Sequence, residues 1–158
     1  MRQVDSRMHY TSGVSGGSTE LQPYILCQAT TVTLVAVNPE PGGQTPIPLT
    51  TEVKDTHAMF AATDSKIYIT EAGNGIFEIV ATILFATDAT GMRELNIMYN
   101  GEESGADSDQ ANGTISHAKT AQKIFYGVEV GDYFEVAARS SFNPINVRRA
   151  SLTVRGLQ

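Results

Sequence analysis

The 158-residue chain has the length of one domain, with 41% hydrophobic residues, only 18% charged residues and a formal net charge of −6. A chain of this size buries a sizeable core, and the low charged fraction suits a surface that packs against other proteins. The acidic balance argues against nucleic acid as a partner, because binding to phosphates requires clustered Lys and Arg. The basic cluster of Arg148, Arg149 and Arg155 is more simply interpreted as a solvated or subunit-contacting strand face.

The N-terminal residues 1–23 are rich in Ser, Gly and Thr and show no sustained periodicity. Such a segment is expected to be disordered when it is alone in solution, so a partner surface is the simplest way to hold it. We therefore expect an extended arm over residues 1–23, followed by one β domain over residues 24–158. The residues expected to anchor the arm to a partner are Arg2, Val4, Arg7, Met8 and Tyr10.

The remainder of the chain alternates β-branched and aromatic runs with turn signals. Some eight to ten short strands without βαβ alternation predict an all-β sandwich or barrel, and the absence of Trp and of a second Cys argues against an immunoglobulin core. The expected strands cover 30–37, 47–53 (an edge strand, because of Pro48), 66–70, 76–86, 93–99, 119–128 and 133–140, with a last strand pair in 145–157 and long loops at 38–46 and 101–118.

One predicted strand, residues 76–86, is apolar on both faces. A strand that is wetted on one side should alternate apolar and polar residues, but here only Glu78 and Thr82 interrupt the second face. We infer that one face packs on the core of the sandwich and the other on a neighbouring subunit.

The single cysteine, Cys27, excludes an intrachain disulfide, and its strand-like surroundings predict a small buried hydrophobic residue. No run approaches the roughly 18 apolar residues of a membrane span, and the N-terminus lacks the apolar core of a signal peptide. These features predict a soluble protein without a membrane partner or a Sec-type export signal.

Motifs that could carry chemistry are sparse. Residues 13–17 fit G-x-S-x-G, but no strand precedes them and no helix follows, as a nucleophile elbow requires. The histidines His9, His57 and His117 share no metal-ligand spacing. The acidic stretch 107–113 is a near miss for an EF-hand loop, which leaves weak calcium binding open. We therefore expect no enzyme, with no catalytic residue, cofactor or dedicated metal site.

Four segments carry a resemblance to a known family: IYITEAGNGIFEI at 67–79, LNIMYNG at 95–101, VEVGDYFEV at 128–136 and ASLTV at 150–154. Their order and spacing resemble the trimeric jelly roll of tumour-necrosis-factor and complement globular-head domains, in the compact, stalkless form found in virion proteins of bacteriophages and other viruses. The first 65 residues depart from the animal pattern, and a collagen-like stalk is lacking. The resemblance implies a homotrimer, with interface residues that we assign to Ile76, Val80, Leu84, Tyr133, Leu152 and Val154.

The function that this resemblance implies is structural. We expect a trimeric capsid decoration or cement protein on the surface of a virion, assembled in the host cytoplasm and anchored by its arm to the major capsid protein or another virion protein. The alternative is a receptor-binding trimer of a phage fibre or tail, in which loops 38–46 and 101–118 contact a host glycan or protein receptor.

Overall fold

The computed structural model describes residues 25–32, 35–37, 43–86, 91–111, 117–140 and 145–157, and every regular element in these ranges is a β-strand. Within them, no helix is long and apolar enough to cross a membrane. The strands are β1 (Leu26–Thr31), β2 (Val35–Val37), β3 (Thr45–Pro46), β4 (Thr51–Asp55), β5 (Phe60–Ala61), β6 (Lys66–Tyr68), β7 (Ile76–Phe85), β8 (Gly91–Tyr99), β9 (Glu102–Ala111), β10 (His117–Tyr126), β11 (Tyr133–Ser140) and β12 (Ile145–Gly156).

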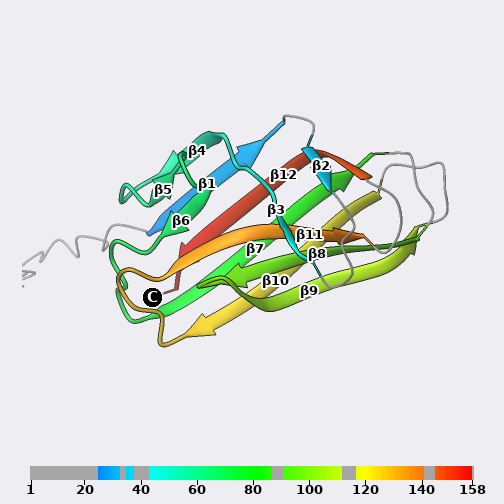
Figure 1. Cartoon of the computed structure of the whole chain (residues 1–158). Coiled ribbons are helices and arrows are strands. Elements are labelled where there is room, and N and C mark those ends of the chain that lie inside the picture. The colour runs from blue at the N-terminus through cyan, green and yellow to red at the C-terminus, as the bar shows by residue number, and fades with distance from the viewer. Residues whose placement is uncertain are drawn as a thin grey trace, which may run out of the picture.

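The strands form two antiparallel sheets that pack face to face (Figure 1). Sheet A has the order β10-β7-β12-β1-β4, with β2 also paired to β12, and sheet B has the order β5-β6-β11-β8-β9, with β3 also paired to β11. The predicted all-β jelly-roll sandwich is confirmed.

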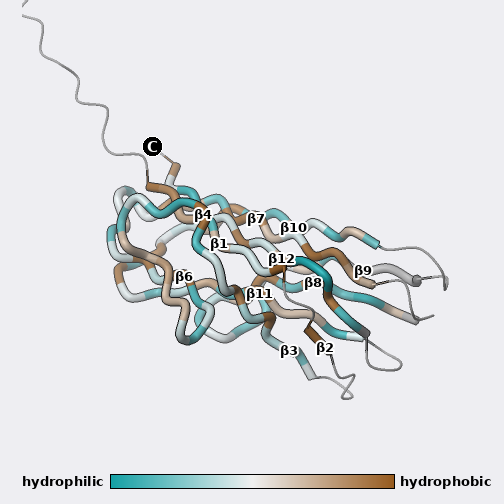
Figure 2. The backbone as a smooth tube through the Cα atoms, turned by 90° about the horizontal axis from the view of Figure 1, so that it is seen from above, coloured by the Kyte–Doolittle hydropathy of each residue, from teal (hydrophilic) through white to brown (hydrophobic). Residues whose placement is uncertain are grey.

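The strand predicted at 76–86 is confirmed as β7. Its burial within the single chain alternates at every residue, because successive side chains of a strand point to opposite faces. Figure 2 shows hydrophobic and hydrophilic residues interspersed along the strands of the two sheets. The fully buried side chains face sheet B; they are Phe77, Ile79, Ala81, Ile83 and Phe85.

The core lies between the two sheets and is aromatic at one end. The Phe134 ring lies 5.1 Å from the Tyr99 ring and 5.0 Å from the Phe125 ring, measured between centroids. Cys27 is fully buried in the same core, as predicted. Burial, and next the nearby Asp55 carboxylate, raise the pKa of the Cys27 thiol, so the side chain stays a neutral, small hydrophobic group.

Two turns meet at the aromatic end of the core. Asn100 and Gly101 both have positive φ, 52° and 83°, as the Asn-Gly turn signal predicts. The Asp132 carboxylate accepts hydrogen bonds from the Tyr99 hydroxyl (2.5 Å) and the Asn100 side-chain amide (2.8 Å). The turn between β8 and β9 is thereby fixed to the turn between β10 and β11.

Several predicted strand boundaries are wrong. The structure has twelve strands in the described ranges, more than the eight to ten expected. The expected strand at 30–37 is divided between β1 and β2. The edge strand expected at 47–53 is β4, at the edge of sheet A, but it begins only at Thr51, and residues 47–50 connect β3 to it. The final strand pair is one strand, β12, which pairs with β7 and β1 along its two sides.

The largest error concerns the predicted loop at 101–118. Glu102–Ala111 form β9, which pairs with β8 from Tyr99↔Glu102 to Gly91↔Ala111, and β10 already begins at His117. The sequence of β9 is polar throughout, so its local propensity favours a loop. The hairpin made by the Asn-Gly turn overrides that propensity, because the turn places this segment beside β8.

Candidate subunit-contact surface

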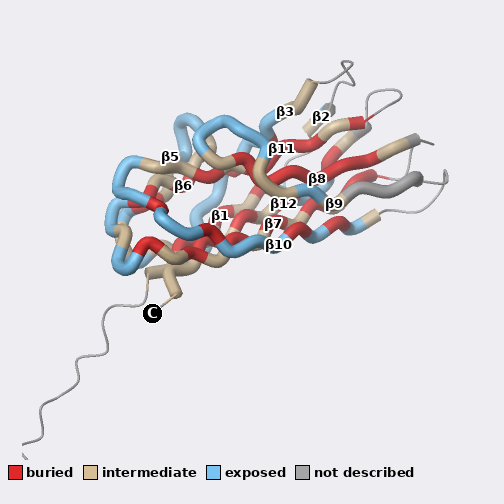
Figure 3. The backbone as a smooth tube through the Cα atoms, turned by 90° about the horizontal axis from the view of Figure 1, so that it is seen from below, coloured by how far each residue is buried: buried red, intermediate tan, exposed pale blue. Residues whose placement is uncertain are grey.

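The outer face of sheet A is the surface on which subunit contacts are predicted. Figure 3 shows β8 buried along much of its length, whereas β10 alternates between buried and exposed residues because its outward side chains are uncovered. Register aligns the outward side chains of neighbouring strands in rows across the sheet. From β10 to β1, three of these rows are Ile124–Glu78–Arg155–Leu26, Gln122–Val80–Thr153–Gln28 and Thr120–Thr82–Ser151–Thr30.

The apolar part of this face lies on β7 and β10. Ile76, Val80 and Leu84 point outward and are only partly buried within the chain. On β10, Ile124 is 43% exposed and Tyr126 is 73% exposed, and Tyr126 lies directly opposite Ile76. On β7 and β10 the single chain therefore leaves five large apolar side chains uncovered, in part or in full.

The two polar interruptions of this face are satisfied inside the chain. Glu78 forms an ion pair with Arg155, and its other oxygen accepts a hydrogen bond of 2.6 Å from the Gln122 side chain. Thr82 shares a hydrogen bond of 3.2 Å with Thr120 on the neighbouring strand. A partner surface could cover these groups without leaving a buried charge unpaired.

Three of the predicted interface residues lie elsewhere. Leu152 and Val154 on β12 are fully buried between the sheets, so they belong to the core and cannot present surface to another subunit. Tyr133 lies on β11 of sheet B, opposite Tyr68. The assignments of Leu152 and Val154 are corrected because the register of β12 points their side chains into the core. The assignment of Tyr133, which is partly buried, stays a prediction.

The predicted arm residues Arg2, Val4, Arg7, Met8 and Tyr10 lie outside the described residues, and so does the motif at 13–17. The arm and the domain boundary at residues 23–24 remain predictions.

An acidic edge borders the contact surface. β9 is the edge strand of sheet B next to β10, and its side chains include Glu102, Glu103 and Asp107. Lysines of β10, the edge strand of sheet A, connect this strand to β9. Lys119, whose side chain is only 7% exposed, pairs with Asp107 at 3.4 Å, and Lys123 Nζ donates to the Ser104 carbonyl. In the sequence, the Asn100-Gly101 turn indicates a strand at this position, whereas the residue types of β9 do not.

The remaining candidates for catalytic or metal chemistry are histidine and acidic side chains. No group of three or more His, Cys, Asp or Glu residues that could hold a metal ion occurs there. His57 Nδ1 lies 2.6 Å from the Thr56 hydroxyl and its Nε2 lies 3.2 Å from Glu71. The same hydroxyl accepts a hydrogen bond from the Leu26 N–H (2.9 Å), so this cluster fixes the start of β1 to two loops.

No family model matches the chain, and no curated protein matches it. Solved structures do share its fold. The globular domain of zebrafish complement 1qA protein superposes with a TM-score of 0.63 at 10% identity, covering 85% of this chain and 98% of that chain. Eiger TNF from S. frugiperda gives a TM-score of 0.57 at 13% identity, with 87% and 94% covered. The PRD1 vertex protein P5 gives 0.64 at 14% identity, with 84% and 73% covered.

The fold is a tumour-necrosis-factor-like jelly roll. The resemblance found in the segments between residues 67 and 154 is thus confirmed for the fold. One structure with this jelly roll is a vertex protein of PRD1, so the fold occurs in a virion component as well as in complement and TNF proteins.

Proposed function

We propose that the chain is a non-enzymatic structural protein of a virus particle: a homotrimer that decorates or cements the capsid surface, anchored through residues 1–23 to the major capsid protein or another virion protein. The observation that carries this proposal is the outer face of sheet A, where a single chain leaves Ile76, Val80, Leu84, Ile124 and Tyr126 uncovered. The fold shared with a PRD1 vertex protein supports the virion location.

Apolar burial is the driving force that we assign to the assembly. Complete burial of one large apolar side chain contributes about 1.5–3 kcal/mol, so the five side chains of this face supply a useful fraction of the cost of association. An exposed patch of this kind on a free chain would favour nonspecific association instead.

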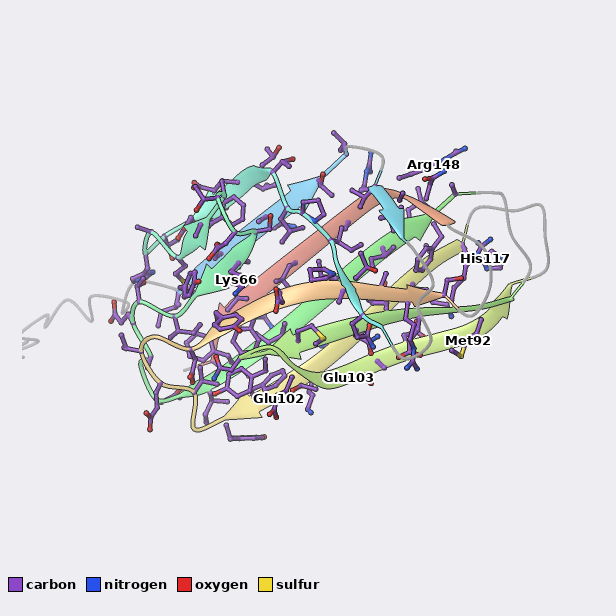
Figure 4. The ribbon with its side chains drawn as sticks, viewed as in Figure 1. Lys66, Met92, Glu102, Glu103, His117 and Arg148 are labelled. Atoms are coloured by element: carbon purple, nitrogen blue, oxygen red, sulfur yellow. The ribbon has the colours of Figure 1, made fainter. Side chains whose placement is uncertain are left out.

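Acidic and basic side chains on different sides of the chain favour a head-to-tail contact between subunits. The β9 edge carries Glu102, Glu103 and Asp107, whereas β12 carries the exposed Arg148 and Arg149. Figure 4 shows Arg148 on the side of the molecule opposite Glu102 and Glu103. Complementary patches on different sides of one subunit suit a head-to-tail contact, which gives a closed ring when the rotation closes.

Solution mass tests the trimer. We expect light scattering to give about three times the 17.0 kDa mass of one chain and Leu84→Glu to give monomers, because a charge would be buried at the contact. Val130→Glu is the matched control, since Val130 is 65% exposed and lies in the turn between β10 and β11, outside this face. A wild-type protein that is monomeric at micromolar concentration would contradict the trimer.

Truncation tests the arm separately. Removal of residues 1–20 should leave a trimer that no longer binds capsids. The full chain should raise the temperature at which capsids fall apart, because a ligand that is specific for the assembled shell stabilises it by mass action. Full occupancy of capsids by the truncated protein would refute the anchoring role and leave the trimer untouched.

A further inference from the structure

Two tyrosines lie side by side on the outer face of sheet B. Tyr68 on β6 pairs directly with Tyr133 on β11, and both point outward because their neighbours Ile67 and Phe134 are fully buried. The ring centroids are 5.6 Å apart and the ring planes meet at 52°. Both side chains are only partly buried, so the pair forms a bent aromatic platform that is open in part to the solvent and that Lys66 covers in part at Tyr133.

Neighbouring groups hold this platform in place. Lys66 Nζ lies 4.0 Å from the centroid of the Tyr133 ring, and the Tyr68 hydroxyl donates to Asp64 at 2.6 Å. A Cβ added at Gly101 would lie 3.1 Å from the Tyr133 hydroxyl, so this oxygen is packed against the turn between β8 and β9. A platform fixed before binding loses little conformational entropy when a ligand arrives.

Beside the platform, a chain of polar side chains crosses the same face. Gln44 donates to Glu103 (3.0 Å), Asn96 donates to both Gln44 (2.8 Å) and Glu94 (3.0 Å), and Arg139 donates to Glu94 (2.6 Å). Mutual hydrogen bonds therefore fix two carboxylates, two amides and a guanidinium in one arrangement.

This network has unused hydrogen-bonding capacity. Among the described residues, the buried Asn96 Oδ1 and Arg139 Nε have no hydrogen-bond partner, although buried polar groups are usually satisfied. Glu135 lies between the network and the platform. It is two residues, or about 7 Å, along β11 from Tyr133. It also lies opposite Met98 on β8, and Met98 pairs with Glu103 of the network.

We propose that this part of sheet B, with Tyr68, Tyr133 and Glu135 as its contact residues, is a binding site for a neutral carbohydrate. The apolar C–H face of a sugar ring would stack on the tyrosines, as other flat ligands stack on aromatic side chains. Its hydroxyl groups would both donate to the carboxylates and accept from the amide and cationic groups nearby.

The charge of the surface selects a neutral ligand. Carboxylates outnumber cations near the platform: Asp64, Glu103 and Glu135 stand against Lys66, whereas Glu94 and Arg139 lie farther along the sheet and pair with each other. Phosphates, sulfates and acidic sugars would be repelled by this surplus of negative charge. The site lies on the sheet opposite the proposed subunit contacts, so it does not depend on the trimer.

The test is an array of immobilised neutral oligosaccharides probed with the full chain. A selected sugar is then titrated against the tyrosine fluorescence, which no tryptophan obscures. We expect at least one neutral sugar to bind, with affinity reduced about tenfold or more in Tyr133→Ala. Tyr133→Phe should retain binding because it keeps the ring. Val53→Ala is the matched control, since Val53 is 55% exposed on β4 of the other sheet and belongs to neither proposed surface.

Tyr68→Ala gives a second route if Tyr133→Ala fails to fold, because Tyr68 lies on the short strand β6 and its hydroxyl donates to the exposed Asp64. Failure of the folded wild-type protein to bind any neutral sugar at millimolar concentration would overturn the proposal. So would equal losses in the Tyr133→Ala and Val53→Ala variants, or binding restricted to cationic peptides.

Discussion

A single carboxylate, Asp132, joins the two turns at the aromatic end of the core. It accepts hydrogen bonds from the Glu129 N–H (2.8 Å) and from the side chains of Tyr99 and Asn100. Burial alone would raise the pKa of Asp132, but these three donors outweigh it and lower the pKa below the usual value. Burial, and next the hydrogen bond to Asp132, raise the pKa of Tyr99 to about 12.

We expect Asp132→Asn to lower the free energy of unfolding by about 1–3 kcal/mol, because an amide cannot accept all three hydrogen bonds. The depressed pKa means that the stabilising effect of Asp132 is fully present above about pH 4 and is lost as the pH falls through the pKa of the folded state. Urea titrations at several pH values should therefore show a weaker acid dependence in the variant.

Asp64→Asn is the control for that measurement, since it removes a Tyr–Asp hydrogen bond that is exposed instead of partly buried. Its effect should stay within about 0.5 kcal/mol. Equal losses in the two variants would contradict a special role for Asp132.

At the scale of elements, β7 and β9 mark what the sequence can and cannot predict. The β-branched residues of β7 point to a strand, and its period of two correctly predicts which residues share a face. Nothing in the polar sequence of β9 favours a strand. Its pairing depends on the position of β8 in space, which a local pattern does not contain.

Only part of the subunit-contact surface on sheet A could be predicted from the sequence, because the sequence does not show which face of a strand is buried. Ile76, Val80 and Leu84 follow the period of one strand, and the structure places them on one outer face. Leu152 and Val154 have the same apolar, alternating pattern, yet they face the core. Which face of a strand is the inner one depends on register with its neighbours, and a shift of one residue inverts it.

Two adjacent residues of β7 allow a direct test of these faces. Ile83→Ala should lower the free energy of unfolding by about 2–5 kcal/mol, because Ile83 is fully buried between the sheets. Leu84→Ala should cost the single chain under about 1.5 kcal/mol and should instead increase dissociation of the assembly on dilution. Urea unfolding and light scattering separate the two effects, and a reversed pattern would show that the faces are assigned wrongly.

At the scale of the whole molecule, the net charge of −6 is spread over a surface with few charged residues. We expect the solubility to be lowest near the pI of about 4.9, where mutual repulsion between molecules vanishes. Turbidity measured between about pH 4 and pH 8 checks this expectation. Lys54 is exposed on the edge strand β4, and Lys54→Glu should move the solubility minimum to lower pH. A minimum that does not move would imply that local patches, not net charge, govern association.

The Asn100-Gly101 turn also affects how the protein ages. An asparagine followed by glycine is the sequence most prone to deamidation, because the small glycine lets its backbone nitrogen attack the side-chain carbonyl. Here both ends of the Asn100 amide are engaged, with the oxygen accepting from Tyr133 N–H (3.0 Å) and the nitrogen donating to Asp132. Deamidation would place a second carboxylate against Asp132, so the hydrogen bonds that set the turn also protect the folded chain from this slow chemical damage.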